Sequence, residues 1–227
     1  MNTDLEQLME KIEYQFNDSS ILLNALTHTS YINEKGSKMD SDNERLEFLG
    51  DAVLELVSTD YLFNHYSDMS EGEMTKLRAS LVCEPALSMD AKAFGLADYI
   101  YLGKGEDSTG GRKKDSIVSD AFEAVIGAIY LDGGLNKAKE FIERFVLDDI
   151  DNKKYFYDSK TVLQQRVDQL GNAKLNYEIV KSEGPDHDKT FFAVVKLNDE
   201  VIGEGVGHTK KRAQMQAALN ALNNMNN

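Results

Sequence analysis

Residues 44–57 read ERLEFLGDAVLELV, and this stretch decides how the rest of the chain is interpreted. Its apolar residues cover most of the circumference of a helix, which predicts that the helix is buried. Three carboxylates nevertheless share one face, because Glu44, Glu47 and Asp51 are spaced i, i+3 and i+7. Acids on a buried helix repel one another and lose their hydration, so this pattern needs a compensating partner.

A second stretch, DAFEAVIGAIYL at residues 120–131, repeats the pattern. Asp120 and Glu123 share a face near its start, among small and apolar residues. Such acids are ordinarily explained by a solvated face or by the dipole at a helix N-terminus. Five acids on two apolar helices instead favour a divalent cation that both helices bind. Oxygen ligands favour Mg²⁺, with Mn²⁺ as a substitute, over zinc. Spacing alone leaves the reaction open.

The composition is that of a globular protein with no membrane partner. Hydrophobic residues make up 41% of the 227 residues, enough for a buried core. No apolar stretch approaches the ~20 residues of a membrane span, and the acidic N-terminus does not resemble a signal peptide. The single cysteine, Cys83, excludes an internal disulfide framework and suits a reducing compartment. A cytoplasmic protein is therefore expected.

The charge divides the chain into two parts. Residues 158–226 carry nine Lys and Arg and nine Asp and Glu, so the whole net charge of −14 falls on residues 1–157. A net charge of −14 by itself argues against a nucleic-acid partner, but a balanced C-terminal part removes that objection for one end of the chain. The division predicts two domains with different roles.

The periodicity differs between the two parts. Residues 1–153 read as an all-α domain, with no convincing strand before residue 155. A polar linker is expected at 151–157, followed by a small α+β domain at 158–226 with the order α-β-β-β-α. Its expected elements are a helix at 159–170, strands at 175–183, 190–198 and 200–206, and a helix at 209–223. The principal helices expected in the first part are 43–57 onwards, 71–83, 85–94, 116–132 and 136–150, with a loop at 103–115.

The first part resembles the ribonuclease III family. NERLEFLGDAVL at 43–54 is similar to the family's signature, and LTHTSY at 26–31 is similar to the stretch that precedes it. EGEMTKLRASLV at 71–82 and GGRKKDSIVSDAFEAVIGAIYLDGG at 110–134 resemble its later blocks, in the family's order and spacing. The resemblance covers almost all of residues 1–150 and implies an endonuclease domain.

The resemblance also implies roles for single residues. The family's catalytic acids fall on Glu47, Asp51, Asp120 and Glu123, and its two further acidic positions fall on Glu44 and Glu71. By this analogy Glu47, Asp120 and Glu123 hold Mg²⁺, while Asp51 positions or deprotonates the attacking water. The family is a homodimer that hydrolyses phosphodiester bonds of double-stranded RNA and leaves 5′-phosphate and 3′-hydroxyl ends. Its substrates include ribosomal RNA precursors and some messenger and small RNAs.

Three nearby residues are interpreted as structural. Glu55 lies on the acidic stripe but matches no catalytic position of the family. His28 has the chemistry of a general base, yet a hydrogen-bonded histidine at a helix end is the preferred interpretation. Cys83 has no neighbouring base in the sequence and is expected to act as a small apolar filler.

Residues 158–224 resemble a double-stranded RNA-binding domain, which recognises the shape of A-form RNA through minor-groove and phosphate contacts. By resemblance, Thr161 and Gln164 contact one minor groove, and His187, in the turn GPDH, contacts the next. Lys210, Lys211 and Arg212 bind phosphates at the start of the last helix. Gln165 and Gln214 replace residues that are charged in many such domains, so contacts at these two positions are left open.

Two other classes of function compete with this interpretation. A non-catalytic protein that binds RNA duplexes would share the C-terminal domain, but it would have no reason to keep six acids. An unrelated all-α metal phosphohydrolase would require His-Asp metal ligands, which the front domain does not offer. Cleavage of an RNA duplex with Mg²⁺ or with a chelator separates these classes.

Overall fold

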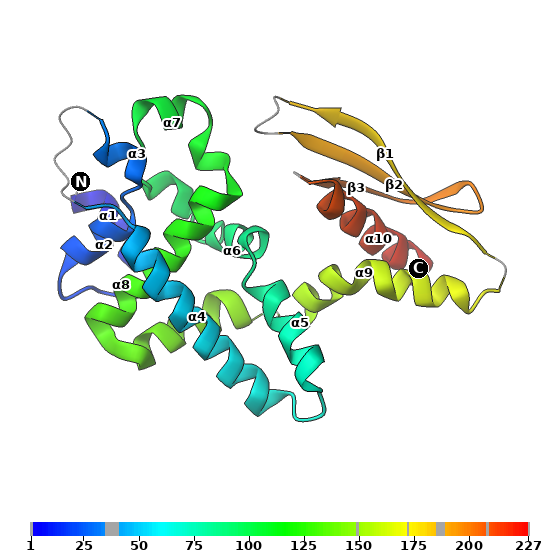
Figure 1. Cartoon of the computed structure of the whole chain (residues 1–227), viewed down its shortest axis with the longest axis horizontal. Coiled ribbons are helices and arrows are strands. Elements are labelled where there is room, and N and C mark those ends of the chain that lie inside the picture. The colour runs from blue at the N-terminus through cyan, green and yellow to red at the C-terminus, as the bar shows by residue number, and fades with distance from the viewer. Residues whose placement is uncertain are drawn as a thin grey trace. The chain divides into compact units, whose positions relative to one another are not determined.

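The chain forms two compact units in a computed structural model, Met1–Ile150 and Asp151–Asn227 (Figure 1). The structure describes residues 2–34, 41–148, 150–171, 173–184, 189–207 and 209–226. The predicted fold class is confirmed: the first unit is helical, and the second has three antiparallel strands between two helices. Within the described residues, no helix is long and apolar enough to cross a membrane.

The first unit contains helices of very different lengths. Their bounds are α1 (Asn2–Lys11), α2 (Ser19–Ala25), α3 (Thr29–Ile32), α4 (Glu44–His65), α5 (Glu71–Leu81), α6 (Glu84–Ala91), η1 (Leu96–Tyr99), α7 (Lys104–Ser108), η2 (Gly111–Lys113), α8 (Asp115–Ile142) and η3 (Glu143–Leu147). The core lies around α8, whose Phe122, Ile126 and Ile129 are fully buried. The segment expected as a loop at 103–115 contains α7 and η2, and its Arg112 and Lys114 form ion pairs within it.

Helices α4 and α8 pack against each other more extensively than any other pair of helices (Figure 1). Two glycines make this contact close. A Cβ atom added at Gly50 would lie 1.8 Å from the carbonyl oxygen of Glu123, and one added at Gly127 would lie 2.3 Å from that of Leu46. Because no side chain separates the two helices there, their backbones touch at the level of the acidic residues.

The prediction that α4 is buried is wrong for one of its faces. Phe48, Leu56 and Phe63 are 80%, 58% and 70% exposed, whereas Leu54 and Val57 on the opposite face are buried. An apolar circumference predicts complete burial only if each face has a partner within the chain. Here the core of the unit covers one face of α4 and leaves an apolar stripe, Phe48–Leu56–Phe63, in contact with solvent.

The boundary expected between helices 116–132 and 136–150 coincides with a break in α8. The backbone leaves helical geometry at Gly134, where φ is 80° and ψ is 178°, and then resumes a helix up to Ile142. Asp132 fixes this corner, because its carboxylate accepts hydrogen bonds from the Tyr14 hydroxyl at 2.7 Å and from the backbone N–H groups of Asn17 and Asp18 at 2.9 and 3.0 Å. The segment after α1 is thereby held against α8.

The second unit comprises α9 (Ile150–Asp168), β1 (Leu175–Glu183), β2 (Thr190–Leu197), β3 (Glu200–Gly207) and α10 (Lys210–Asn226). The strands form one antiparallel sheet in the order β1-β2-β3. Ala193 and Val195 of β2 pack in a common core with Leu163 of α9 and with the alanines of α10. This core joins both helices to the sheet.

The polar linker predicted at 151–157 is wrong, because α9 runs without a break from Ile150 to Asp168. The segment DNKKYFY contains neither glycine nor proline, so nothing in it interrupts a helix once the helix has started. Polarity was therefore a poor indicator of a linker at this position.

The close contact of α4 and α8 predicts that Gly127→Ala destabilises the protein. The added methyl group must displace backbone atoms of α4, so we expect the free energy of unfolding to fall by about 1–3 kcal/mol in urea denaturation. Gly72→Ala is the matched control, because nothing lies within 4 Å of a Cβ atom added there, on helix α5. Equal stability of the two variants would contradict this packing argument.

Candidate metal centre and nucleic-acid interface

Three carboxylates meet where α4 and α8 touch. Glu47, Asp120 and Glu123 each offer one oxygen atom, and these three atoms all lie within 4.8 Å of one another. Glu47 comes from the first turn of α4. Asp120 and Glu123 come from adjacent turns of α8. The sequence proposed these same three residues as metal ligands, and the structure brings them together; that they bind an ion remains a prediction.

Burial and mutual repulsion both act on this cluster. Burial, together with the smaller effects of the charges of Asp51, Glu47 and Asp120, raises the pKa of Glu123 from its usual 4.5 to about 8. Burial likewise raises the pKa of Glu47, with contributions from Asp120, Glu44 and Asp51. Burial also raises the pKa of Asp120, which the Ser119 hydroxyl and the charge of His28 oppose. Among the described residues, the negative charge of the cluster is therefore only partly compensated.

The other acids predicted from the family pattern lie at different distances from this cluster. Asp51 and Glu44 are exposed on α4, and both raise the pKa of Glu47, so they lie at its rim. Glu71 is the first residue of α5 and lines a separate hollow with Thr59. Thr59 lies twelve residues beyond Glu47, about 18 Å along the helix. Within one chain, Glu71 therefore lies too far from Glu47, Asp120 and Glu123 to join their cluster.

His28 has the structural role preferred from the sequence. It is the N-cap of α3, where its Nδ1 accepts a hydrogen bond from the backbone N–H of Ser30 at 3.2 Å. Its own backbone N–H donates to the carbonyl of Tyr101 at 3.1 Å. The residue before His28 also contacts the start of α4, because the backbone N–H of Asn43 donates to the carbonyl of Thr27 at 2.9 Å.

Two features near the cluster were missed in the sequence. Glu55 forms an ion pair with Arg78 of α5, with Nε and Oε2 2.8 Å apart, so the acidic stripe of α4 ends in a neutralised carboxylate. Glu84, at the start of α6, has a pKa raised by burial and by the charges of Asp115 and Asp120. Helical spacing relates residues on one helix only, so it gives no signal for contacts made by α5 and α6.

The residues predicted to bind RNA lie on the two helices of the second unit. Thr161, Gln164 and Gln165 are exposed on α9. Lys210 and Lys211 are exposed in the first turn of α10, and Arg212 is half-buried there. The Thr209 hydroxyl caps this helix by accepting from the backbone N–H of Arg212 at 3.1 Å. His187, the other predicted contact, lies outside the described residues.

The raised pKa of Glu123 predicts how the metal-free protein responds to pH. Between the usual pKa of 4.5 and the value of about 8, the folded protein holds a proton that the unfolded chain has released. The free energy of unfolding should therefore fall as the pH rises through this range. Urea denaturation in a chelating buffer should show this fall, and Glu123→Gln should reduce it and be the more stable protein at high pH. An unchanged pH dependence in this variant would contradict the burial of Glu123 as a carboxylic acid.

Both halves of the chain match known families. A sequence model described as "Ribonuclease-III-like" matches residues 18–150, and one described as "Double-stranded RNA binding motif" matches residues 159–225. "Ribonuclease 3" of Listeria monocytogenes serotype 4a is 47% identical over 97% of each chain. "Ribonuclease 3" of Oceanobacillus iheyensis is 44% identical over 99% of each chain.

A solved structure agrees with these matches. The nuclease domain of ribonuclease III from Campylobacter jejuni, described as having a region involved in dimer formation, superposes with a TM-score of 0.59 and 43% identity. It covers 64% of this chain and 97% of its own. With a family match over more than half of its residues and relatives of similar length throughout, this chain belongs to the ribonuclease III family of double-strand-specific endoribonucleases.

Proposed function

We propose that the protein hydrolyses phosphodiester bonds in double-stranded RNA with Mg²⁺, or with Mn²⁺ in its place, and leaves 5′-phosphate and 3′-hydroxyl ends. The observation that carries this proposal is the cluster of Glu47, Asp120 and Glu123. Two oxygens on opposite sides of one Mg²⁺ lie about 4.2 Å apart. Oxygens within 4.8 Å of one another therefore need only small side-chain rotations to fit the ion. Their raised pKa values indicate that a cation would relieve strong repulsion.

The residues divide the chemistry among them. Glu47, Asp120 and Glu123 bind the ion, which when bound lowers the pKa of a water molecule and offsets charge on the phosphoryl oxygens. Asp51 positions or deprotonates the attacking water. Its place supports this role, since it is exposed to solvent at the rim of the cluster. Glu44 lies at the same rim. Any part that Glu71 takes in the reaction has to come through a second copy of the chain or through the RNA.

The second unit supplies affinity for the duplex. Thr161 and Gln164 contact a minor groove from α9, and Lys210, Lys211 and Arg212 bind phosphates from α10, with His187 directed at the next minor groove. Exposure of the α9 and α10 residues supports this arrangement. The proposed domains are the endonuclease at 1–153 and the RNA-binding domain at 158–226. The proposed place of action is the cytoplasm, on ribosomal RNA precursors and some messenger and small RNAs.

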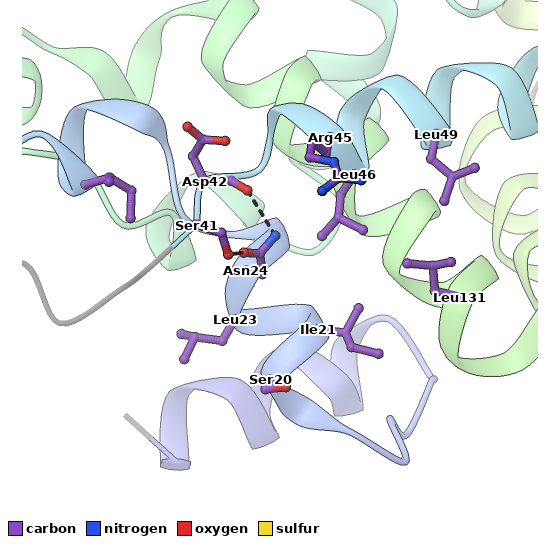
Figure 2. A pocket seen from close by; sticks show the side chains of 11 residues that line it. Ser20, Ile21, Leu23, Asn24, Ser41, Asp42, Arg45, Leu46, Leu49 and Leu131 are labelled. Atoms are coloured by element: carbon purple, nitrogen blue, oxygen red, sulfur yellow. Dashed lines mark hydrogen bonds between the residues drawn. The ribbon is translucent and has the colours of Figure 1, made fainter.

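A homodimer accounts for the apolar stripe on α4. Phe48 is 80% exposed, and such a residue is stabilised when a partner covers it. Near it lies a hollow of about 930 Å³, into which Ile21 of α2, Leu49 of α4 and Leu131 of α8 project (Figure 2). In a two-fold dimer each copy can place its Phe48 in the hollow of the other. The relative described above as having a region involved in dimer formation supports this proposal.

The test of the catalytic proposal is the cleavage of a perfect RNA duplex by Glu123→Gln. We expect cleavage at limiting Mg²⁺ to fall at least about 100-fold, because the amide is a poorer ligand for the ion, while duplex binding stays within a few-fold. Glu140→Gln makes the same change on α8 at an exposed residue far from the cluster and should cleave normally. Cleavage by Glu123→Gln at the rate of the unchanged protein would refute the ligand assignment.

The dimer proposal predicts that Phe48→Asp yields monomers. A buried aromatic side chain at the centre of an interface contributes at least about 2 kcal/mol, so the dissociation constant should rise about 30-fold or more. Sedimentation equilibrium measures this directly. Leu170→Asp is the control, because Leu170 is also exposed, at 61%, but lies on the second unit. Dimers of unchanged affinity in Phe48→Asp would exclude this face.

A further inference from the structure

Lys160 occupies an unusual place on the second unit. Its Nζ donates a hydrogen bond to Oε1 of Gln214 on α10 at 2.9 Å and lies 4.3 Å from the centre of the Tyr177 ring on β1. The side chain is half-buried between α9, α10 and the sheet. The amide and the ring both favour a cation at this point, but neither carries a negative charge.

The charges around Lys160 are positive. Burial and the charge of Lys211 both lower the pKa of Lys160. Among the residues that the structure describes, no carboxylate lies within ion-pair distance of Lys160, Lys210 or Lys211. Two lysines of the strands differ, since Lys181 pairs with Glu183 and Lys196 with Glu178. Lys160, Lys210 and Lys211 therefore leave positive charge without a carboxylate partner on α9 and in the first turn of α10.

The identity of residue 214 decides this charge. Gln214 stands where many double-stranded RNA-binding domains carry a charged residue. A carboxylate at this position would form an ion pair with Lys160 at the observed 2.9 Å and would cancel its charge. The glutamine amide keeps the side chain in place and leaves the cation uncompensated. An anion that approaches this junction would relieve the repulsion between Lys160 and Lys211.

The position of Lys160 is also held rigidly. The Ser159 hydroxyl, which is fully buried, donates to the carbonyl of Met215 at 2.9 Å. This hydrogen bond joins α9, at the residue before Lys160, to α10. Thr161, the next residue, is exposed on the face assigned to the minor groove. Lys160 thus lies at the junction between the helix that contacts bases and sugars and the helix that contacts phosphates.

We propose that Lys160 is a third phosphate-binding lysine, which acts with Lys210 and Lys211 because residue 214 is a glutamine. This inference rests on the proposed function in one respect, namely that the second unit binds double-stranded RNA. The competing explanation is that Lys160 only positions α10 through Gln214 and Tyr177. The two explanations differ in salt dependence, because a lost phosphate contact lowers the slope of log K against log salt, whereas a displaced helix chiefly lowers affinity.

The experiment measures binding of the full chain to a perfect RNA duplex in a chelating buffer across a range of salt concentrations. Lys160→Gln should reduce the salt slope by about one unit, and Gln214→Glu should do the same by pairing with the unchanged lysine. Lys196→Gln is the control for charge, since Lys196 lies on the sheet and is already paired with Glu178. Its slope should equal that of the unchanged protein.

The outcomes separate the alternatives. A slope in Gln214→Glu equal to that of the unchanged protein would overturn the proposal, even if Lys160→Gln failed to fold. Thermal unfolding of each variant identifies such a failure. A reduced slope in both variants with an unchanged melting temperature would support the phosphate contact. If the unchanged protein itself did not bind the duplex, the proposed function would fail first, and this inference with it.

Discussion

The contact between the backbones of α4 and α8 is the constraint on which the rest of the first unit depends. Gly50 and Gly127 allow each helix to reach the main chain of the other, where a methyl group would overlap carbonyl oxygens. At ordinary helix separations of 8–10 Å, side chains would fill this space. Because they do not, Glu47 on one helix and Glu123 on the other come close enough for their oxygens to share one ion. Both glycines lie within a turn of an acid of the cluster, so the packing and the chemistry use the same few residues.

This arrangement is electrostatically unfavourable without a cation. Burial and like charges raise the pKa of Glu47 and of Glu123, so part of the folding free energy is lost in bringing them together. The core around Phe122 compensates for this cost, since α8 is buried along most of its first four turns. Because this core holds the backbone of α8 in place, its carboxylates can separate only by rotation of their side chains. The repulsion therefore remains, and it would favour the binding of a metal ion at the proposed site.

The sequence predicted features that depend on the spacing of residues within one segment. It failed for features that depend on which other segment, if any, packs against them. The acidic face of each helix and the strand β1 follow from periods of 3.6 and 2, which a single segment contains. The exposure of Phe48 does not, because the same apolar residue is buried or exposed according to what lies opposite. The continuous helix through residues 151–157 was missed for a related reason: a polar segment without glycine or proline can form either a linker or a solvated helix. The Arg78–Glu55 pair joins two helices, so no spacing along one of them reveals it.

Charge is arranged differently in the two units, although both have to accept the same polyanion. The first unit carries the net negative charge and offers a site that a divalent cation can convert from repulsive to attractive. The second unit, residues 151–227, has a net charge of only +1, and its positive and negative side chains are separated in space. Its acids neutralise lysines on the strands, as Glu178 does for Lys196, while Lys160 of α9 and Lys210 and Lys211 of α10 have no carboxylate within ion-pair distance among the described residues. A balanced domain can therefore present a positive face to RNA without being basic. Net charge alone would have hidden this, because attraction to a phosphate depends on the charges within about a Debye length of it.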